Sequence, residues 1–449
     1  MESSDVVILG GGFAGLACAT RLAEARARVT LLEKRPHLGG RAYSFVDPRL
    51  GCAVDNGQHL FMGCYRHTRA FLRRIGTESL LHFPERVRID YADALGRHDS
   101  LRLPGWLAPP FHLAAGVLGL GGLSWRDKAA LRNLDRAMRR LSDGENPGDL
   151  DALTVRQWLN SLGQPRSLQE RLLDPIAVGA LNELPENASA LGFFQVMREL
   201  FYCDAEATRL GFPTVGLSEL YTGQACRFIE DRGGCVLTQQ SVAALVGDWG
   251  GVREARTEGA GCYRAQAFVS AVPPWALGRV QRPKSVEGPW LSWKPAPIVG
   301  INLWLDSIVI DKPMIGLLGT QLHWVFDKTR LWGLDASRGQ YLSLVISGAH
   351  RQIGFSPQEL LELSVRDLSC CFPAFEKAKI RAWSVVKEPY ATPSPVCGSD
   401  AWRPAHKSAV SNLYLAGDWT QTGLPATIES ATASGHACAE LILGGSSHD

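Results

Sequence analysis

The sequence predicts an α/β fold in which a discontinuous, Rossmann-like dinucleotide-binding domain carries an inserted α+β domain. Three observations predict it. A glycine-rich strand–helix–strand unit opens the chain, a strand ending in Gly-Asp followed by a small-residue helix closes it, and two long segments lie between. The 449 residues suffice for two or three domains at roughly 100 to 200 residues each.

The N-terminal unit contains the most specific motif. Residues 5–9 and 29–32 are short apolar runs that predict strands, and an Ala/Leu-rich helical pattern lies between them. Gly10, Gly12 and Gly15 stand in G-x-G-x-x-G register, which is typical of dinucleotide binding. We expect Gly10 to make the turn, Gly12 to admit a pyrophosphate to the backbone, and Gly15 to bring helix and strand together.

The second predicted strand ends in an acidic residue, 18 positions beyond Gly15. A carboxylate at Glu33 accepts hydrogen bonds from a ribose hydroxyl and repels a 2′-phosphate, which favours an unphosphorylated adenosine such as that of FAD or NAD. Gly39 and Gly40 follow, where paired glycines let backbone pass close to a ligand, and Arg41 is placed to pair with a phosphate.

These motifs resemble the flavin-dependent oxidoreductases of the amine oxidase and phytoene desaturase superfamily, in which a Glu and then Gly-Gly-Arg follow the first βαβ unit. Residues 55–65, which begin Asp-Asn-Gly-Gln-His, extend the resemblance to the isoprenoid-handling branch. The resemblance implies FAD as the cofactor and places residues 55–65 beside the flavin ring. At the C-terminus, it implies that Gly417-Asp418 meets the pyrophosphate or ribityl chain and that the helix from Thr427 faces the pyrimidine. The implied cofactor-binding residues are Gly10, Gly12, Phe13, Ala14, Gly15, Glu33, Lys34, Gly40, Arg41, Gly57, Gln58, His59, Val242, Gly417, Asp418, Thr427, Ile428 and Ser430.

The resemblance also implies the division of the chain into domains. The FAD-binding domain is expected to combine residues 1–90, 225–285 and 400–449. A substrate-binding domain is expected to combine residues 91–224, which read as mostly helical, with residues 286–399, which read as rich in strands. The resulting fold is of the amine oxidase and phytoene desaturase type.

An apolar segment within the first insertion indicates the kind of substrate. Residues 103–125 contain no Asp, Glu, Lys or Arg, and residues 124–141 then carry six Arg or Lys against two Asp. An apolar hairpin followed by a basic helix is typical of a monotopic membrane contact. The alternative is a buried lid over an apolar tunnel. Both interpretations point toward lipid, and the sequence leaves the choice open.

Composition and charge exclude other classes. The net charge of +2, from 47 basic against 45 acidic residues, supplies no broad field for nucleic acid. Eleven scattered cysteines without a C-x-x-C pair or an H-E-x-x-H motif predict no metal site and a reducing compartment. Because the first predicted strand begins at residue 5, we expect no signal peptide. These features predict a cytoplasmic protein, peripheral on the inner face of the cytoplasmic membrane.

Over the whole chain, the sequence most resembles the hydroxysqualene dehydroxylases of hopanoid and squalene biosynthesis, also called squalene-associated FAD-dependent desaturases. Residues 55–59, 181–190 and 216–221 carry this resemblance. It implies reduction of hydroxysqualene to squalene with loss of water, on the membrane surface, with upstream squalene-pathway synthases and an electron-donating reductase as partners.

His59 is the candidate proton donor in this reaction; alternatively, it is a structural histidine that holds the cofactor loop. The motifs alone do not fix the direction of the reaction. A phytoene or carotenoid desaturase, which runs a related path in reverse, is therefore an alternative function. A non-catalytic binder of isoprenoid lipids on the same fold is a second alternative.

Overall fold

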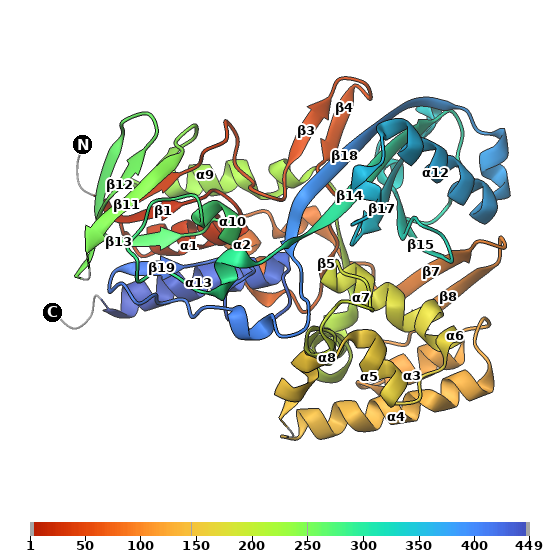
Figure 1. The fold of residues 1–449 in the computed structure, drawn as a ribbon. Helices are drawn as coiled ribbons and strands as arrows, with labels where there is room; N and C mark the ends of the chain where they lie inside the picture. Colours follow the sequence, from red (N-terminus) through yellow and green to blue (C-terminus); the bar gives the residue numbers. More distant parts are fainter. Residues whose placement is uncertain (1–3, 145, 249, 446–449) are drawn as a thin grey trace.

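The computed structural model describes residues 4–144, 146–248 and 250–445. The chain forms two lobes, each built on a seven-stranded sheet (Figure 1). The first lobe holds both ends of the described chain. The second lobe combines a mainly antiparallel sheet with a layer of helices.

The first sheet has the strand order β10-β2-β1-β13-β12-β11, and β19 pairs with the free edge of β13. Pairing among β1, β2, β10, β13 and β19 is parallel, whereas β11, β12 and β13 form an antiparallel meander. Both faces of β1 are buried, as expected for a parallel sheet covered on each side. The strands are β1 (Ser4–Leu9), β2 (Val29–Leu32), β10 (Cys235–Leu237), β11 (Val242–Asp248), β12 (Gly251–Thr257), β13 (Cys262–Ser270) and β19 (Leu413–Leu415).

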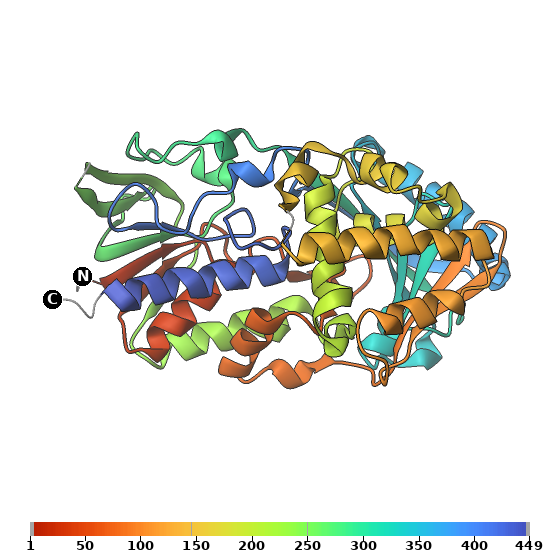
Figure 2. The same cartoon turned by 90° about the horizontal axis from the view of Figure 1, so that it is seen from below.

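Helix α1 (Phe13–Glu24) lies between this sheet and α13 (Ile428–Gly445), so the first and last helices of the chain lie side by side (Figure 2). Glycine permits both contacts. A Cβ at Gly15 would clash with the carbonyl oxygen of Gly10, and one at Gly435 would clash with the carbonyl of Ala14. The same lobe contains α2 (Arg66–Arg74), α9 (Gly223–Glu230) and α10 (Pro274–Leu277).

The second sheet has the order β18-β14-β17-β16-β15-β7-β8 and takes strands from both segments expected to be inserted. Only the pairing of β15 with β7 is parallel in this sheet, among the described residues. Helix α12 (Pro357–Cys371) packs on it over an apolar cluster. The strands are β7 (Val87–Asp93), β8 (His98–Leu103), β14 (Pro295–Leu305), β15 (Met314–Leu318), β16 (Trp324–Asp327), β17 (Gln340–Ser347) and β18 (Ile380–Pro393).

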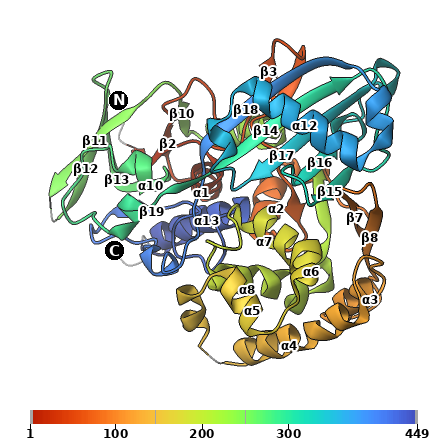
Figure 3. The same ribbon diagram turned by 45° about the vertical axis from the view of Figure 1, so that its right-hand side comes forward.

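Within segment 91–224, predicted to be mostly helical, residues 111–198 are mostly helical, whereas β8 and β9 (Leu210–Pro213) are strands. Helices α3 and α4 form the outer rim of this helical layer (Figure 3). The helices are α3 (Phe111–Leu118), α4 (Trp125–Ser142), α5 (Val155–Ser161), α6 (Arg166–Leu168), α7 (Asp174–Leu181) and α8 (Ala190–Arg198). Short elements join the lobes: β3 (Ser44–Asp47), β4 (Cys52–Asp55), β5 (Phe61–Met62), β6 (Leu81–His82), β9 (Leu210–Pro213) and α11 (Lys328–Leu331).

The apolar segment 103–125 divides its side chains between two environments. It contains one short helix, α3, and the basic helix α4 begins at its last residue. Val117, Leu120 and Leu123 are buried against the helical layer. Four others face solvent, with exposures of 83% for Trp106, 61% for Phe111, 54% for Leu118 and 75% for Trp125. Within the described chain, the helices lack the combination of length and apolar character that crossing a bilayer demands.

The turn before β16 contains a histidine that is neutral in the folded state. His323 Nδ1 accepts a hydrogen bond from the Ser347 N–H at 3.1 Å, and burial lowers the pKa of its ring to about 4. An unfolded histidine titrates near pH 6.5. The unfolded chain therefore binds more protons between these two values, so the free energy of unfolding falls as the pH is lowered through this window.

We expect His323→Gln to weaken this pH dependence, since Gln does not titrate. At about pH 5.5, the wild-type histidine should lower the free energy of unfolding by at most about 1.4 kcal/mol relative to neutral pH. Urea unfolding midpoints of both proteins at about pH 7.5 and 5.5 measure the difference. Equal losses of stability in the two proteins would contradict the assignment to His323.

Candidate functional site

A cavity of about 1060 Å³ is lined by residues of both lobes. One end lies against the glycine-rich loop before α1 and the C-terminal segment before α13. The other end lies between the second sheet and helices α7 and α8. The two ends differ in chemistry, because the first presents backbone N–H groups and charged side chains, whereas the second presents apolar side chains.

The glycine-rich loop forms an open cradle at the polar end. Gly12 is the N-cap of α1, and no side chain caps this helix. A Cβ at Gly12 would face the cavity and come no closer than 3.7 Å to its nearest neighbour, the Cα of Gly40. Two glycine backbones thus face each other across the start of a helix whose first N–H groups lack side-chain partners. Such an arrangement suits a pyrophosphate.

The Glu33 carboxylate is fixed at the same end of the cavity. It is 5% exposed; its Oε2 accepts from the Gly11 N–H and its Oε1 from the Arg35 N–H, both at 2.8 Å. Each oxygen retains a second lone pair. Because the backbone orients the carboxylate, Glu33 is able to accept hydrogen bonds from a ribose without rearrangement.

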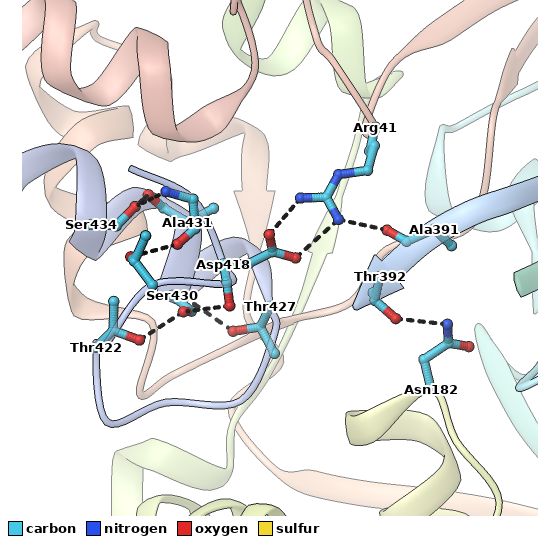
Figure 4. Close-up of polar contacts among 12 residues, drawn as sticks. Arg41, Asn182, Ala391, Thr392, Asp418, Thr422, Thr427, Ser430, Ala431 and Ser434 are labelled. Carbon is cyan, nitrogen blue, oxygen red and sulfur yellow. Dashed lines mark hydrogen bonds and ion pairs between the residues drawn. The ribbon is translucent and has the colours of Figure 1, made fainter. Parts of the chain in front are cut away.

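An ion pair joins the N-terminal and C-terminal motifs (Figure 4). Arg41 Nη1 and Nη2 donate to the two carboxylate oxygens of Asp418, at 3.0 and 2.5 Å, and Nη1 also donates to the carbonyl of Ala391 on β18 at 2.9 Å. The sequence predicts a phosphate as the partner of Arg41; in this structure its partner is Asp418. The bidentate geometry fixes the guanidinium plane at the cavity wall.

The segment before α13 is also held by side-chain hydrogen bonds (Figure 4). Thr427 Oγ1 accepts from the Ser430 N–H at 3.2 Å, and Ser430 Oγ lies 2.7 Å from the hydroxyl of Thr422. The Gly417 N–H donates to Ser434 Oγ at 2.7 Å. These bonds leave Thr427 at the cavity wall and Ser430 behind it.

All but two of the predicted cofactor-binding residues line the cavity. Gly15 and Ser430 do not; both are part of the packing that supports the wall. The lining residues that the sequence predicted are Gly10, Gly12, Phe13, Ala14, Glu33, Lys34, Gly40, Arg41, Gly57, Gln58, His59, Val242, Gly417, Asp418, Thr427 and Ile428.

Residues 55–59 begin at the last residue of β4 and lie where the two lobes meet. Asn56 accepts from the Tyr43 N–H at 3.0 Å and donates to the Arg41 carbonyl at 3.1 Å, which ties this loop to the Gly-Gly-Arg segment. His59 Nδ1 lies 2.7 Å from the Gly57 carbonyl, so Nδ1 carries the proton and neutral His59 has its lone pair on Nε2. Burial lowers the pKa of the His59 ring.

The sequence did not identify Tyr221 as a support of the cavity. Its buried hydroxyl donates to the carbonyls of Gly39 and Ala42, at 2.9 and 2.7 Å, and its ring stacks on Phe13 with 3.9 Å between centroids. Tyr221 lies in one of the motifs that carry the resemblance, but nothing in that motif indicates the residues it contacts.

For the apolar end of the cavity, the sequence predicted an inserted domain and, as one alternative, an apolar tunnel, but not the elements that form its wall. Alternate residues of β7 face it, and this alternation of apolar with charged positions could have been found in the sequence. Its walls come from the second sheet, including β7 and β8, from helices α7 and α8, and from the turn after α8. They include Val87, Ile89, Leu101, Leu103, Ile176, Val196, Leu200, Phe201, Met314, Trp324, Phe326 and Val345.

The donor set fits FAD. The cavity is polar beside a helix N-terminus and apolar where a ring system and a hydrophobic substrate would meet. By contrast, the described residues contain no group of three or more His, Cys, Asp or Glu side chains placed to hold a metal ion.

Comparison with known proteins agrees with this geometry. The family model described as flavin containing amine oxidoreductase matches residues 13–443. The chain is 29% identical to a hydroxysqualene dehydroxylase of Rhodopseudomonas palustris, over 98% of this chain and 99% of that one. It is 28% identical to one of Sinorhizobium fredii, over 98% of each chain. A 15-cis-phytoene desaturase of Solanum lycopersicum is 25% identical over 98% of this chain and 77% of its own length.

Solved structures share the fold. An oxidoreductase from Methanosarcina mazei has a TM-score of 0.75 at 15% identity, over 97% of this chain and 99% of that one. Cyclohexylamine oxidase from Brevibacterium oxydans has a TM-score of 0.72 at 18% identity, over 99% of each chain. At these identities, the likeness shows an α/β FAD-binding fold and nothing about substrate.

The cradle around Gly12 generates a test of cofactor binding. In Gly12→Val, the branched side chain would occupy the space between Gly12 and Gly40 and should block a pyrophosphate while leaving the fold intact. We expect the variant to purify colourless, with the circular dichroism spectrum of the parent. Gly354→Val is the matched control, because a Cβ at Gly354 meets nothing within 4 Å; this variant should stay yellow. Full flavin occupancy in Gly12→Val would refute the phosphate-loop assignment.

Proposed function

Because this chain belongs to the family of flavin containing amine oxidoreductases and is an FAD-dependent oxidoreductase, we propose that it reduces hydroxysqualene to squalene with loss of water. The single observation that carries the proposal is a cavity that joins a dinucleotide cradle to an apolar end within one space. End-to-end similarity to hydroxysqualene dehydroxylases supports the choice of substrate.

In this proposal, Gly12, Glu33 and Asp418 hold FAD at the polar end, together with the other lining residues predicted from the sequence. The first lobe, from about 1–90, 225–285 and 400–449, forms the FAD-binding domain. The substrate-binding domain, from about 91–224 and 286–399, contributes most of the apolar end and receives the isoprenoid chain; β7 (Val87–Asp93) crosses its first boundary. The side chains of the apolar end exclude water, so that few nucleophiles compete for the reacting carbon.

The chemistry requires one hydride and one proton. Bound FAD, when reduced, would supply a hydride to the carbinol carbon as the C–O bond breaks. The departing hydroxyl takes a proton and leaves as water. We assign His59 as the proton donor, because it lines the cavity beside the cofactor motif. Burial lowers its pKa, so the protonated ring is a stronger acid than a free histidine, and turnover should rise as the pH falls.

A desaturase is the runner-up, and the similarity to 15-cis-phytoene desaturases favours it over a non-catalytic lipid binder. A desaturase would accept hydride from its substrate, whereas the proposed reaction delivers hydride. The direction of electron flow therefore separates the two, and a protein that purifies yellow would count against the non-catalytic lipid binder.

The direct test is product analysis with reduced enzyme. Anaerobic protein is first reduced with dithionite in deuterated buffer, which bleaches the flavin. One equivalent of yellow, oxidised flavin should then form for each equivalent of hydroxysqualene added. Squalene with deuterium at the former carbinol carbon should appear, because the transferable hydrogen of reduced flavin exchanges with solvent. If bleached enzyme stays bleached while oxidised enzyme inserts double bonds into phytoene, the desaturase function replaces the proposed one.

We also propose that the protein is cytoplasmic and docks on the inner face of the cytoplasmic membrane, near the upstream synthases and an electron-donating reductase. Trp106, Phe111, Leu118 and Trp125 form an exposed apolar rim, and the adjoining α4 carries exposed arginines that suit anionic headgroups. A ~30-carbon isoprenoid costs on the order of 20 kcal/mol to bring into water, so direct transfer from the bilayer is favoured.

The rim generates a second test of this proposal. Trp106→Asp combined with Leu118→Asp should weaken sedimentation with anionic liposomes and slow turnover of membrane-embedded substrate, since both side chains face solvent. Ile308→Asp, at a 52% exposed position in the turn after β14, is the control and should behave as the parent. Unchanged binding and turnover in the double variant would leave segment 103–125 as an internal lid.

A further inference from the structure

A buried lysine lies directly behind the loop of residues 55–59. Lys328, the first residue of α11, is 1% exposed, and its Nζ lies 2.9 Å from Asp55 Oδ2 and 2.9 Å from Gln58 Oε1. Gln58 and His59 line the cavity, whereas Lys328 does not. The lysine therefore contacts the cavity wall from behind.

The ammonium of Lys328 has three N–H donors. Two face the oxygens of Asp55 and Gln58, and the Trp332 ring centroid lies 3.6 Å from Nζ, within the range of a cation–π contact. The lysine is also buried and does not line the cavity. Lys328 thus acts on the protein around the cavity and not on a molecule inside it.

Helix α11 is itself fixed to the second sheet. Gln340 Nε2 donates to Asp327 Oδ2 at 2.8 Å, and the Tyr341 N–H donates to Thr329 Oγ1 at 2.7 Å. Both neighbours of Lys328 in sequence are therefore anchored to β17. Such anchoring sets where the ammonium lies, and through it where the loop of the first lobe lies relative to the second sheet.

We propose that Lys328 is a positioning residue that holds Gln58 and His59 in the reactive geometry. The proposal rests on the proposed function, in which His59 protonates the leaving hydroxyl. The Gln58 side chain accepts from Lys328 and donates to the His59 carbonyl at 3.1 Å. The connection therefore runs from the second sheet through Lys328 and Gln58 to the backbone of His59.

The charges near His59 act in opposite directions on its pKa. Burial lowers it most strongly, the Asp55 carboxylate raises it, the hydrogen bond to the Gly57 carbonyl also raises it, and the Lys328 ammonium lowers it. Removing Lys328 alone leaves Asp55 unopposed, so the His59 pKa should rise. Replacing Asp55 by Asn as well removes both charges, so the pKa should fall back again.

The test compares Lys328→Met, the double variant Asp55→Asn/Lys328→Met, and Lys387→Met as holoenzymes. Lys387 is the control, since it is a partly buried lysine on β18 whose Nζ donates to the carbonyls of Ile353 and Phe355, away from the cavity. We expect kcat on hydroxysqualene to fall about tenfold to a hundredfold in both Lys328 variants, with KM changed less than about twofold and flavin bound. Lys387→Met should keep the parent kcat.

The His59 pKa, measured by NMR with labelled histidine and assigned with His59→Gln, needs no substrate. We expect it to rise in Lys328→Met and to fall back in the double variant, a pattern that a purely structural role would not produce. Parent kcat in either Lys328 variant, or an unchanged His59 pKa in Lys328→Met, would overturn the proposal. If Lys328→Met does not fold, the test uses the double variant, which leaves no unpaired charge. A lower kcat in that variant would support the proposal, and parent kcat would overturn it. If the parent does not turn over hydroxysqualene, the proposed function fails while the NMR result still decides the role of Lys328.

Discussion

The structure depends on backbone surfaces that approach each other without side chains between them. Gly15 lets α1 contact the loop at Gly10, and Gly435 lets α13 contact α1 at Ala14. These contacts bring the first and last helices together, so that two motifs about 400 residues apart in sequence face one cavity. The pair between Arg41 and Asp418 then fixes their separation. A larger side chain at either glycine would push apart walls that belong to the same site.

The two sheets make one end of the cavity polar and the other end apolar. The parallel sheet places loops and a helix start at one end, where backbone N–H groups and Glu33 are available. The second sheet turns alternate side chains of β7 toward the other end, and alternation within a strand keeps charged residues such as Arg88 and Asp90 on the opposite face. A ligand with a charged half and an apolar half is thus accommodated without burying an unpaired charge.

The sequence predicted those parts of the fold and site whose signals are local. The strand–helix–strand unit, Glu33 and the Gly-Gly-Arg segment were recognisable because the required residues are close together in sequence, and the observed α1 begins at Phe13. Partners that come from distant segments were not predictable. Examples are Asp418 for Arg41, Lys328 for Asp55 and the carbonyls bound by Tyr221. Segment 103–125 shows a related limit, since its composition is apolar throughout but packing decides that Leu120 is buried and Leu118 is not.

The strand order of the first sheet has a consequence for synthesis on the ribosome. Its edge strand β19 comes from residues 413–415, whereas every strand of the second sheet has been made by residue 393. During translation, the second lobe is complete while the first still lacks β19 and α13. The edge of β13 that pairs with β19, and the face of α1 that packs against α13, therefore stay uncovered until residues 413–445 have been made. Incomplete chains that expose strand edges and apolar surface are prone to aggregate, so β19 and α13 protect the first lobe once they have been made.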